Sequence, residues 1–193
     1  DAPAYLPALA HRFPDPATRY ATPGLAADRR AFSTNAEIGQ WLRQLADAPA
    51  PATGARTSLL SVGLSQRGLP IHAVVIARAS GSSPAQLDAS RRPTVLLVGQ
   101  QHGDEPAGSE ALLVVAQELS RGLLEPLLER INVVIVPRAN PDGAEAGTRT
   151  TASGVDMNRD NLLLSPCFFD TSDAADDTPC GDTGGLSVLT TIM

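Results

Sequence analysis

Apolar residues recur with a helical period in one stretch near the start of the chain. Between Thr34 and Pro49, four apolar positions are spaced as on one face of a helix: Ile38, Trp41, Leu42 and Leu45. Thr34 and Glu37 have the spacing of a capping box, in which each side chain accepts a hydrogen bond from the backbone N–H of the other residue. The pattern predicts an amphipathic helix that follows Thr34 and is stopped by proline.

Two continuous apolar runs, residues 94–99 and 131–137, have the pattern of strands that are covered on both faces. Residues 108–122 between them have a helical period that ends at Gly122. A strand, a helix and a strand in this order predict a parallel crossover. Residues 57–78 predict two further strands joined by a hairpin turn at QRG. We therefore expect an α/β fold with a mixed, mostly parallel sheet flanked by helices.

The composition of the chain changes near Asn161. All 15 basic residues are arginines that precede it, whereas the remainder holds five aspartates, no basic residue and no helical or strand period. We expect three parts: an irregular N-terminal segment over 1–32, an α/β unit over 33–161, and an atypical acidic tail over 162–193 that is disordered or out of frame.

The charge and hydropathy of the chain restrict the classes of binding partner that can be expected. The net charge is −6 and no stretch is basic, which argues against a nucleic-acid partner. No apolar run approaches the roughly 20 residues of a membrane span, so no membrane partner is expected. The chain starts at Asp1 with a segment that suits the residues after a cleaved signal peptide, which favours a secreted or periplasmic protein. Cys167 and Cys180 could then form a disulfide, or remain two free thiols.

The candidate chemistry begins in QHGDEPAG, residues 101–108, just after the first buried run. His102 and Glu105 are three residues apart, and Gly99 and Gly103 allow the backbone to curl so that both side chains aim at one point. A neutral imidazole and a carboxylate are both good zinc ligands. The carboxyl end of a strand is also where α/β proteins place their sites.

A catalytic zinc site usually has three protein ligands and an open position, so this pair is not a complete site. The other two histidines, His11 and His72, are expected at the surface or at a sheet edge and not as ligands. A His-x-x-Glu pair by itself also occurs by chance.

Residues 137–160 form a long connection, which hints at function. NPDG, residues 140–143, has the chemistry of a turn. Arg149, Asn158 and Arg159 follow it, and guanidinium groups can bind a carboxylate through two hydrogen bonds. These three residues either form an anion receptor or are solvated loop residues.

Taken together, these motifs resemble the zinc metallocarboxypeptidase family typified by carboxypeptidase A, and its bacterial members in particular. QHGDEPAG is similar to the family's zinc motif, and PRANPDG, GTR and GVDMNRD are similar to its loop for the substrate carboxylate. The similarity extends over about residues 33–161. It implies a mixed sheet between helices, zinc as the cofactor, and hydrolysis that removes C-terminal amino acids from peptides.

The resemblance also implies roles for individual residues. His102 and Glu105 would be zinc ligands, and Arg149 would polarise the scissile carbonyl and stabilise the developing oxyanion. Asn158 and Arg159 would bind the terminal carboxylate of a peptide or small carboxylate substrate.

Three parts of the family pattern have no counterpart: a third zinc ligand (His) downstream, a general base (Glu) beyond it, and a Tyr that helps hold the substrate. Here the last His is His102, the last Glu is Glu145 and the last Tyr is Tyr20. The C-terminal part of the fold is therefore expected to be missing, with one sheet edge unpaired. A truncated or frame-shifted enzyme, a short homologue completed by another subunit, and a non-catalytic domain are the three explanations.

Three functions remain open at this point. The first is a zinc carboxypeptidase that is weakly active or inactive as this chain alone. The second is an N-acyl amino acid deacylase of the same fold, because its substrates are carboxylates too. The third is a non-catalytic domain that binds a carboxylate or a peptide end. An aggregation-prone fragment without activity is the least specific alternative.

Overall fold

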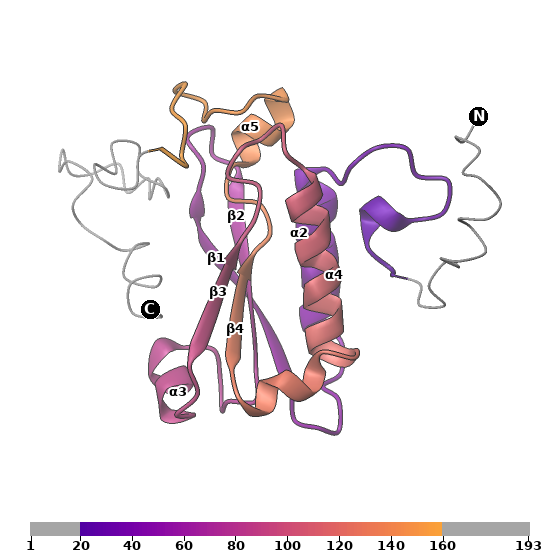
Figure 1. The fold of residues 1–193 in the computed structure, drawn as a ribbon, viewed down its shortest axis with the longest axis vertical. Coiled ribbons are helices and arrows are strands. Elements are labelled where there is room, and N and C mark those ends of the chain that lie inside the picture. Colours follow the sequence, from indigo (N-terminus) through magenta and orange to yellow (C-terminus); the bar gives the residue numbers. More distant parts are fainter. Residues whose placement is uncertain (1–19, 160–193) are drawn as a thin grey trace, which may run out of the picture.

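The computed structural model describes residues 20–159 of the chain. A four-stranded sheet forms the centre, and two long helices, α2 (Asn35–Asp47) and α4 (Ala107–Arg121), lie side by side against one of its faces (Figure 1). The expected acidic tail, both cysteines and most of the expected irregular N-terminal segment lie outside the described residues. Those expectations therefore stay predictions.

The strands lie in the order β1-β2-β4-β3, with these bounds: β1 Arg56–Leu64, β2 Pro70–Ala77, β4 Asn132–Val136 and β3 Thr94–Val98. β3 and β4 are parallel, with Val98 opposite Val136, so the crossover through α4 is confirmed. β2 is antiparallel to both of its neighbours, β1 and β4. The fold is α/β with a mixed sheet, but the expectation of a mostly parallel sheet is wrong for the described strands.

The position of β2 explains this difference. The hairpin turn between β1 and β2 was expected, but β2 was not expected to continue the sheet onto β4. Six of its eight residues are buried, as in a strand with neighbours on both sides and cover on both faces. The run AVVIA, residues 73–77, carries this signal in the sequence. A hairpin therefore joins the crossover unit through its second strand, and its antiparallel direction dominates the sheet.

Helix α2 begins where its capping pattern predicts. The Glu37 backbone N–H donates to the Thr34 hydroxyl oxygen at 3.2 Å, and the Thr34 backbone N–H donates to the Glu37 carboxylate at 2.7 Å. Arg29 donates two further hydrogen bonds to this carboxylate. The bonds from Arg29, followed by those from Thr34, lower the pKa of Glu37 to about 2. All four expected apolar residues of the helix are buried: Ile38, Trp41, Leu42 and Leu45.

The core lies on both faces of the sheet because side chains alternate along each strand. On one face, Val74 and Ile76 of β2 pack with the buried residues of α2 and α4. On the other face, Val75 packs with Leu87 and Met157. The loop that carries the candidate carboxylate-binding residues is thus anchored to the second core cluster through Met157.

Short helices occur where the sequence suggested only loops. α3 (Pro84–Ala89) is capped by Ser83, and α5 (Pro141–Ala146) is capped by Asn140. Both have proline in the first turn, where its missing N–H costs nothing. NPDG is therefore a helix start and not an isolated turn. Two short 3-10 helices complete the described elements, η1 (Pro23–Leu25) and η2 (Glu125–Glu129). None of the helices among residues 20–159 has both the length and the apolar character that crossing a membrane requires.

Candidate functional site

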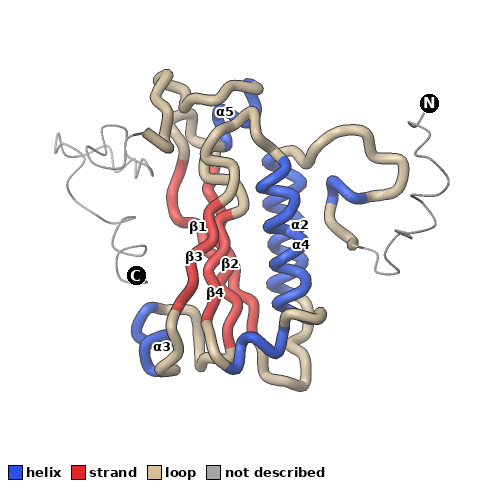
Figure 2. Tube along the Cα trace, in the orientation of Figure 1, coloured by secondary structure: helices blue, strands red, loops and turns tan. Residues whose placement is uncertain are grey.

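The turn after β3 and the loop after β4 meet at one end of the sheet, beside α5 (Figure 2). Backbone hydrogen bonds join them: the Gly99 carbonyl accepts from Ala139 N–H at 3.0 Å, and the Gln100 carbonyl accepts from Asn140 N–H at 3.1 Å. Parallel pairing of β3 with β4 puts the carboxyl ends of both strands at this edge. The two segments singled out in the sequence are therefore neighbours in space.

The Asn140 side chain links these segments to α5. Its carbonyl oxygen accepts from Gly143 N–H at 2.9 Å and caps the helix. Its amide nitrogen donates to the carbonyls of Gln101 at 3.2 Å and Thr150 at 3.1 Å. Because Asn140 is only 3% exposed, these bonds have little competition from water and fix the turn relative to the loop.

His102 lies between two carboxylates. Its Nδ1 is 3.1 Å from Glu105 Oε2, and its Nε2 is 2.9 Å from Asp156 Oδ1. The His102 side chain is 8% exposed, whereas the Glu105 side chain is 61% exposed. The pair thus combines a fixed imidazole with a carboxylate that solvent and ligands can reach.

Arg149 closes this cluster into a ring. Its Nε donates to Asp156 Oδ2 at 2.9 Å, and its Nη1 donates to Glu105 Oε1 at 3.1 Å. Each carboxylate therefore gives one oxygen to the imidazole and the other to the guanidinium. The structure brings His102, Glu105 and Arg149 together on one side of the turn, while their roles stay predictions.

The ring of charges keeps both acids ionised. Burial acts to raise the pKa of Asp156, but hydrogen bonds from His102, Arg149 and the Asn158 backbone outweigh it and lower this pKa to about 2. The hydrogen bond with His102 is the main cause that lowers the pKa of Glu105. The hydrogen bond to Asp156 in turn raises the pKa of Arg149. The cluster is thus set up as two anions around one permanent cation.

The His102–Glu105 geometry suits a shared cation. A neutral imidazole has one N–H, and if it points from Nε2 to Asp156, then Nδ1 presents a lone pair to Glu105 Oε2. Two acceptors 3.1 Å apart repel each other unless a proton or a metal ion lies between them. Ligand atoms at zinc bond lengths of about 2.0–2.2 Å with tetrahedral angles lie about 3.4 Å apart. The donor chemistry and spacing of this pair therefore fit two ligand positions of zinc.

No further ligand is available in the described part of the chain. Among residues 20–159, no group of three or more His, Cys, Asp or Glu side chains gathers in a way that could hold a metal ion. Asp156 bonds to the far nitrogen of the imidazole, and this is the usual place for a carboxylate that orients a zinc-binding histidine.

Asn158 and Arg159 lie next to the ring along the chain, but their side chains do not join it. The Asn158 backbone N–H donates to Asp156 at 2.9 Å, and Arg159 Nη1 donates to the Asn158 carbonyl at 2.9 Å. Arg159 is exposed and Asn158 is half-buried. Their predicted role in binding a carboxylate stays a prediction.

Three polar residues of this region were not predicted from the sequence. Asp156 orients His102, while Gln100 and Arg138 are buried behind the turn at 6% and 7% exposure. Asp156 stands in the motif GVDMNRD that the resemblance used, so an unassigned acid between two assigned segments was its signal. Nothing in the sequence alone marks Gln100 or Arg138 as buried.

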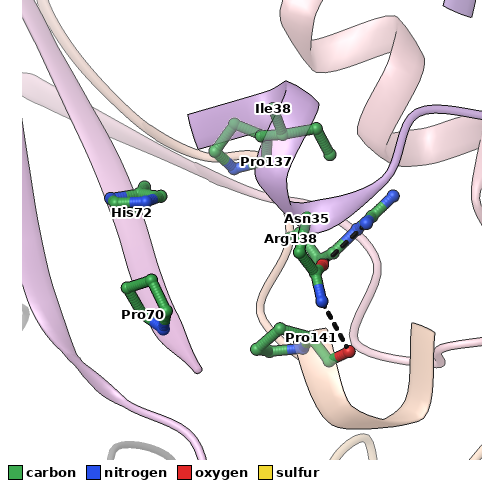
Figure 3. A pocket seen from close by; sticks show the side chains of 7 residues that line it. All are labelled: Asn35, Ile38, Pro70, His72, Pro137, Arg138 and Pro141. Atoms are coloured by element: carbon green, nitrogen blue, oxygen red, sulfur yellow. Dashed lines mark hydrogen bonds between the residues drawn. The ribbon is translucent and has the colours of Figure 1, made fainter. Parts of the chain in front are cut away.

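His72 was expected at the surface or at a sheet edge, and this expectation is wrong. It lies on the central strand β2, half-buried, with its Nε2 close to Gly39 of α2. It lines a cavity of about 10 Å³ together with Asn35, Ile38, Pro70 and three residues near the end of β4 (Figure 3). Such a cavity holds at most one water molecule. His72 is thus a packing residue and is not part of the ring around His102, whereas His11 lies outside the described residues.

Comparisons with known proteins agree with this architecture. The family model described as zinc carboxypeptidase, Peptidase M14, matches residues 38–187. This is a family of hydrolases that act as proteases. Carboxypeptidase 2 of Trichophyton rubrum is 38% identical over 88 residues, which are 45% of this chain and 16% of that protein. Carboxypeptidase SOL1 of Arabidopsis thaliana is 34% identical over 107 residues, 53% of this chain and 21% of that protein. The chain thus matches only about a fifth of the length of these relatives.

Solved structures show the same fold. Carboxypeptidase A from Helicoverpa armigera superposes with a TM-score of 0.58 at 20% identity, covering 83% of this chain and 42% of that one. The metallo-carboxypeptidase from Burkholderia cenocepacia gives a TM-score of 0.52 at 21% identity, covering 65% of this chain and 32% of that one. At these identities the likeness concerns the fold alone, whereas the family match covers most of the sequence. The chain belongs to the zinc carboxypeptidase family.

Proposed function

We propose that this chain takes part in the zinc-dependent removal of C-terminal amino acids from peptides. The observation that carries the proposal is the ring around His102, in which an imidazole, two carboxylates and a guanidinium converge where β3 and β4 end. Family membership makes zinc and a peptide substrate the natural ligands of such a ring.

In this proposal His102 and Glu105 bind the zinc ion, which when bound acts as a Lewis acid on the scissile carbonyl. Asp156 would accept the Nε2 hydrogen of His102, and the Nδ1 lone pair would then be available to bind the metal. Glu105 contributes Oε2, because its Oε1 accepts from Arg149. Two ligands hold zinc more loosely than the usual three, so we expect weak zinc binding and weak or no activity from these residues alone.

Arg149 is assigned the role of stabilising the negative charge that develops on the carbonyl oxygen of the substrate. Its Nε and Nη1 are held by Asp156 and Glu105, and no described residue accepts a hydrogen bond from its Nη2. A guanidinium that is fixed by two carboxylates keeps its orientation during the reaction, which is what electrostatic stabilisation of a transition state needs. Asn158 and Arg159 would bind the terminal carboxylate, and this requirement restricts cleavage to a chain end.

A carboxylate-binding module without turnover is the second candidate. It is favoured by the lack of a third metal-ligating group among residues 20–159. This candidate predicts affinity for the free carboxylate of a peptide that does not depend on zinc.

The test measures zinc and turnover in the same preparations. The purified chain is equilibrated with micromolar zinc, and bound metal is counted by mass spectrometry for the wild type, His102→Ala and the control His72→Gln. We expect the His102 variant to lose the zinc and the control to keep it, because His72 lies outside the ring. Equal zinc in the wild type and His102→Ala would contradict the proposal.

The substrate is tested with three compounds: an N-blocked dipeptide with a free carboxylate, the same dipeptide as its amide, and an N-acyl amino acid. Release of the C-terminal residue from the first compound alone supports a carboxypeptidase. Faster hydrolysis of the N-acyl amino acid would point to a deacylase. Zinc-independent binding of the first compound without hydrolysis would identify the binding module.

A further inference from the structure

Gln100 has an unusual backbone for its residue type. It lies two residues before His102, and its φ is +45°, in the left-handed region that residues other than glycine rarely adopt. Its side chain is only 6% exposed. Such a conformation persists only where the surroundings enforce it, and it is found preferentially at functional sites.

The side-chain amide of Gln100 is held at both ends. Its Nε2 donates to the Gly103 carbonyl at 2.8 Å, and its Oε1 accepts from Arg138 Nε at 2.7 Å. Only one orientation of the amide satisfies both neighbours. A flipped amide would set its oxygen against a carbonyl and its NH₂ against a guanidinium, and both contacts are repulsive.

Arg138 is in turn fixed by the start of helix α2. It donates through Nη1 to Asn35 Oδ1 at 2.7 Å and through Nη2 to the Ser33 carbonyl at 2.8 Å. Burial lowers its pKa, whereas the carboxylates of Glu110 and Glu145 act to raise it from beyond 4.0 Å, and among residues 20–159 no carboxylate pairs with it directly. The hydrogen-bond partners of this buried guanidinium are all neutral, so its bonds serve to fix neighbouring groups and not to pair with an acid.

We propose that Arg138 and Gln100 are positioning residues for the His102–Glu105 pair. Arg138 orients the Gln100 amide, and this amide fixes the carbonyl of Gly103, which lies between the two ligands in the chain. The peptide planes of the turn are thereby set so that the imidazole and the carboxylate face one point. The inference deepens the proposed function and rests on His102 and Glu105 as zinc ligands.

Gln100→Glu is the informative substitution, because it separates support of Arg138 from support of the turn. The new carboxylate still accepts from Arg138 and adds an ion pair, but it has no hydrogen to donate to the Gly103 carbonyl. We therefore expect folding to be maintained and the turn to lose its geometry. Gln101→Glu is the matched control: it adds the same charge one residue further along, at a half-buried side chain. Gln100→Met, of similar size and without charge, guards against an effect of charge or poor folding.

Three readouts are taken on the full chain. Urea unfolding checks that the variants fold. Zinc affinity is measured by competition with a chromophoric chelator. The ¹⁵N chemical shifts of the His102 ring in metal-free protein at pH 8 report whether one tautomer is held, and this signal does not depend on zinc.

We expect both Gln100 variants to bind zinc on the order of 10–100-fold more weakly, as is usual when a residue that supports a metal ligand is lost. The ¹⁵N chemical shifts of the two His102 imidazole nitrogens should be well separated in the wild type and in Gln101→Glu. In both Gln100 variants the two shifts should move toward each other, because the two tautomers then interconvert. If both Gln100 variants keep the zinc affinity of the wild type and its ¹⁵N shifts of the His102 imidazole, the inference is overturned. If the wild type and His102→Ala bind zinc equally but the ring shifts still depend on Gln100, the positioning role stands and the proposed function falls.

Discussion

Gly103→Ala should be the most damaging small substitution in the His102 turn. A Cβ at this position would overlap the backbone of Gly143 and Ala144 in α5, well inside the 3.0 Å that Cβ atoms keep from other heavy atoms. Backbone cannot rotate away as a side chain can, so restoring ordinary contact requires the turn and α5 to separate by about 1 Å or more. Overpacking of this kind costs about 1–3 kcal/mol. Sites with fixed geometry tolerate displacements of only about 0.5 Å. The relative placement of the His102 and Glu105 side chains should therefore be lost as well.

The assay is urea unfolding followed by tryptophan fluorescence. Trp41 is the only tryptophan of the chain and lies buried in α2, so it reports the loss of the core. The matched control is Gly108→Ala, five residues further along, where a Cβ would meet nothing closer than 3.9 Å. Gly108 lies in α4, where alanine is favoured over glycine by up to about 1 kcal/mol. We expect the two substitutions to change the free energy of unfolding in opposite directions. A Gly103→Ala variant within about 0.5 kcal/mol of the wild type would refute the close contact between the turn and α5.

Three further results are expected. Asp156→Asn removes the charge that orients the imidazole and should weaken zinc binding by about 10–100-fold in chelator competition, and an unchanged affinity would show that Asp156 has no such role. The pKa of Glu37 is lowered in the folded state to about 2 from 4.5, so its ionisation stabilises the fold above about pH 4.5 and this contribution disappears as the pH falls toward 2. Urea unfolding should therefore show Glu37→Gln to be less stable than the wild type at pH 7, with the difference cut to roughly half at pH 3 and largely gone at pH 2; a difference that does not change with pH would contradict the assignment. Leu42→Ala should cost about 2–5 kcal/mol in the same assay, because Leu42 is fully buried, and a loss below about 1 kcal/mol would mean that the site collapses around the smaller side chain.

Local signals in the sequence predicted the elements well. The capping pair Thr34–Glu37 located the start of α2, and Gly122 marked the end of α4. The parallel pairing of β3 with β4 followed from two apolar runs around one helix. These features depend on neighbours in the chain, and the sequence contains that information directly.

Pairings between distant segments were harder to predict. The apolar run 73–77 indicates that β2 is an interior strand, but it does not specify β4 as the second neighbour. The same holds for Arg138: its partner Asn35 is 103 residues away, so the burial of this arginine is a property of the assembled fold. The helix α5 was missed for another reason, because asparagine and proline start turns and helices alike.

The candidate site shows the same difference between residues that are close in sequence and residues that are distant. His102 and Glu105 were found because they are close in sequence, and their side chains do meet. Asp156, 54 residues from His102, entered only through the structure. The family resemblance supplied Arg149 before any geometry was known, and the structure then placed it against both carboxylates.

Asn35 joins three elements through one side chain. Its oxygen accepts from Arg138 just after β4, and its amide nitrogen donates to the Pro141 carbonyl (Figure 3). The same nitrogen also donates to Glu145 in α5. Asn35 is also the first residue of α2, and terminal turns are where helices fray most readily. Fraying at this end of α2 therefore cannot stay local, because it breaks contacts with the strand end and the helix that frame the His102 turn. We therefore expect the first turn of α2 and the end of the sheet that carries the ring to open and close as one cooperative unit.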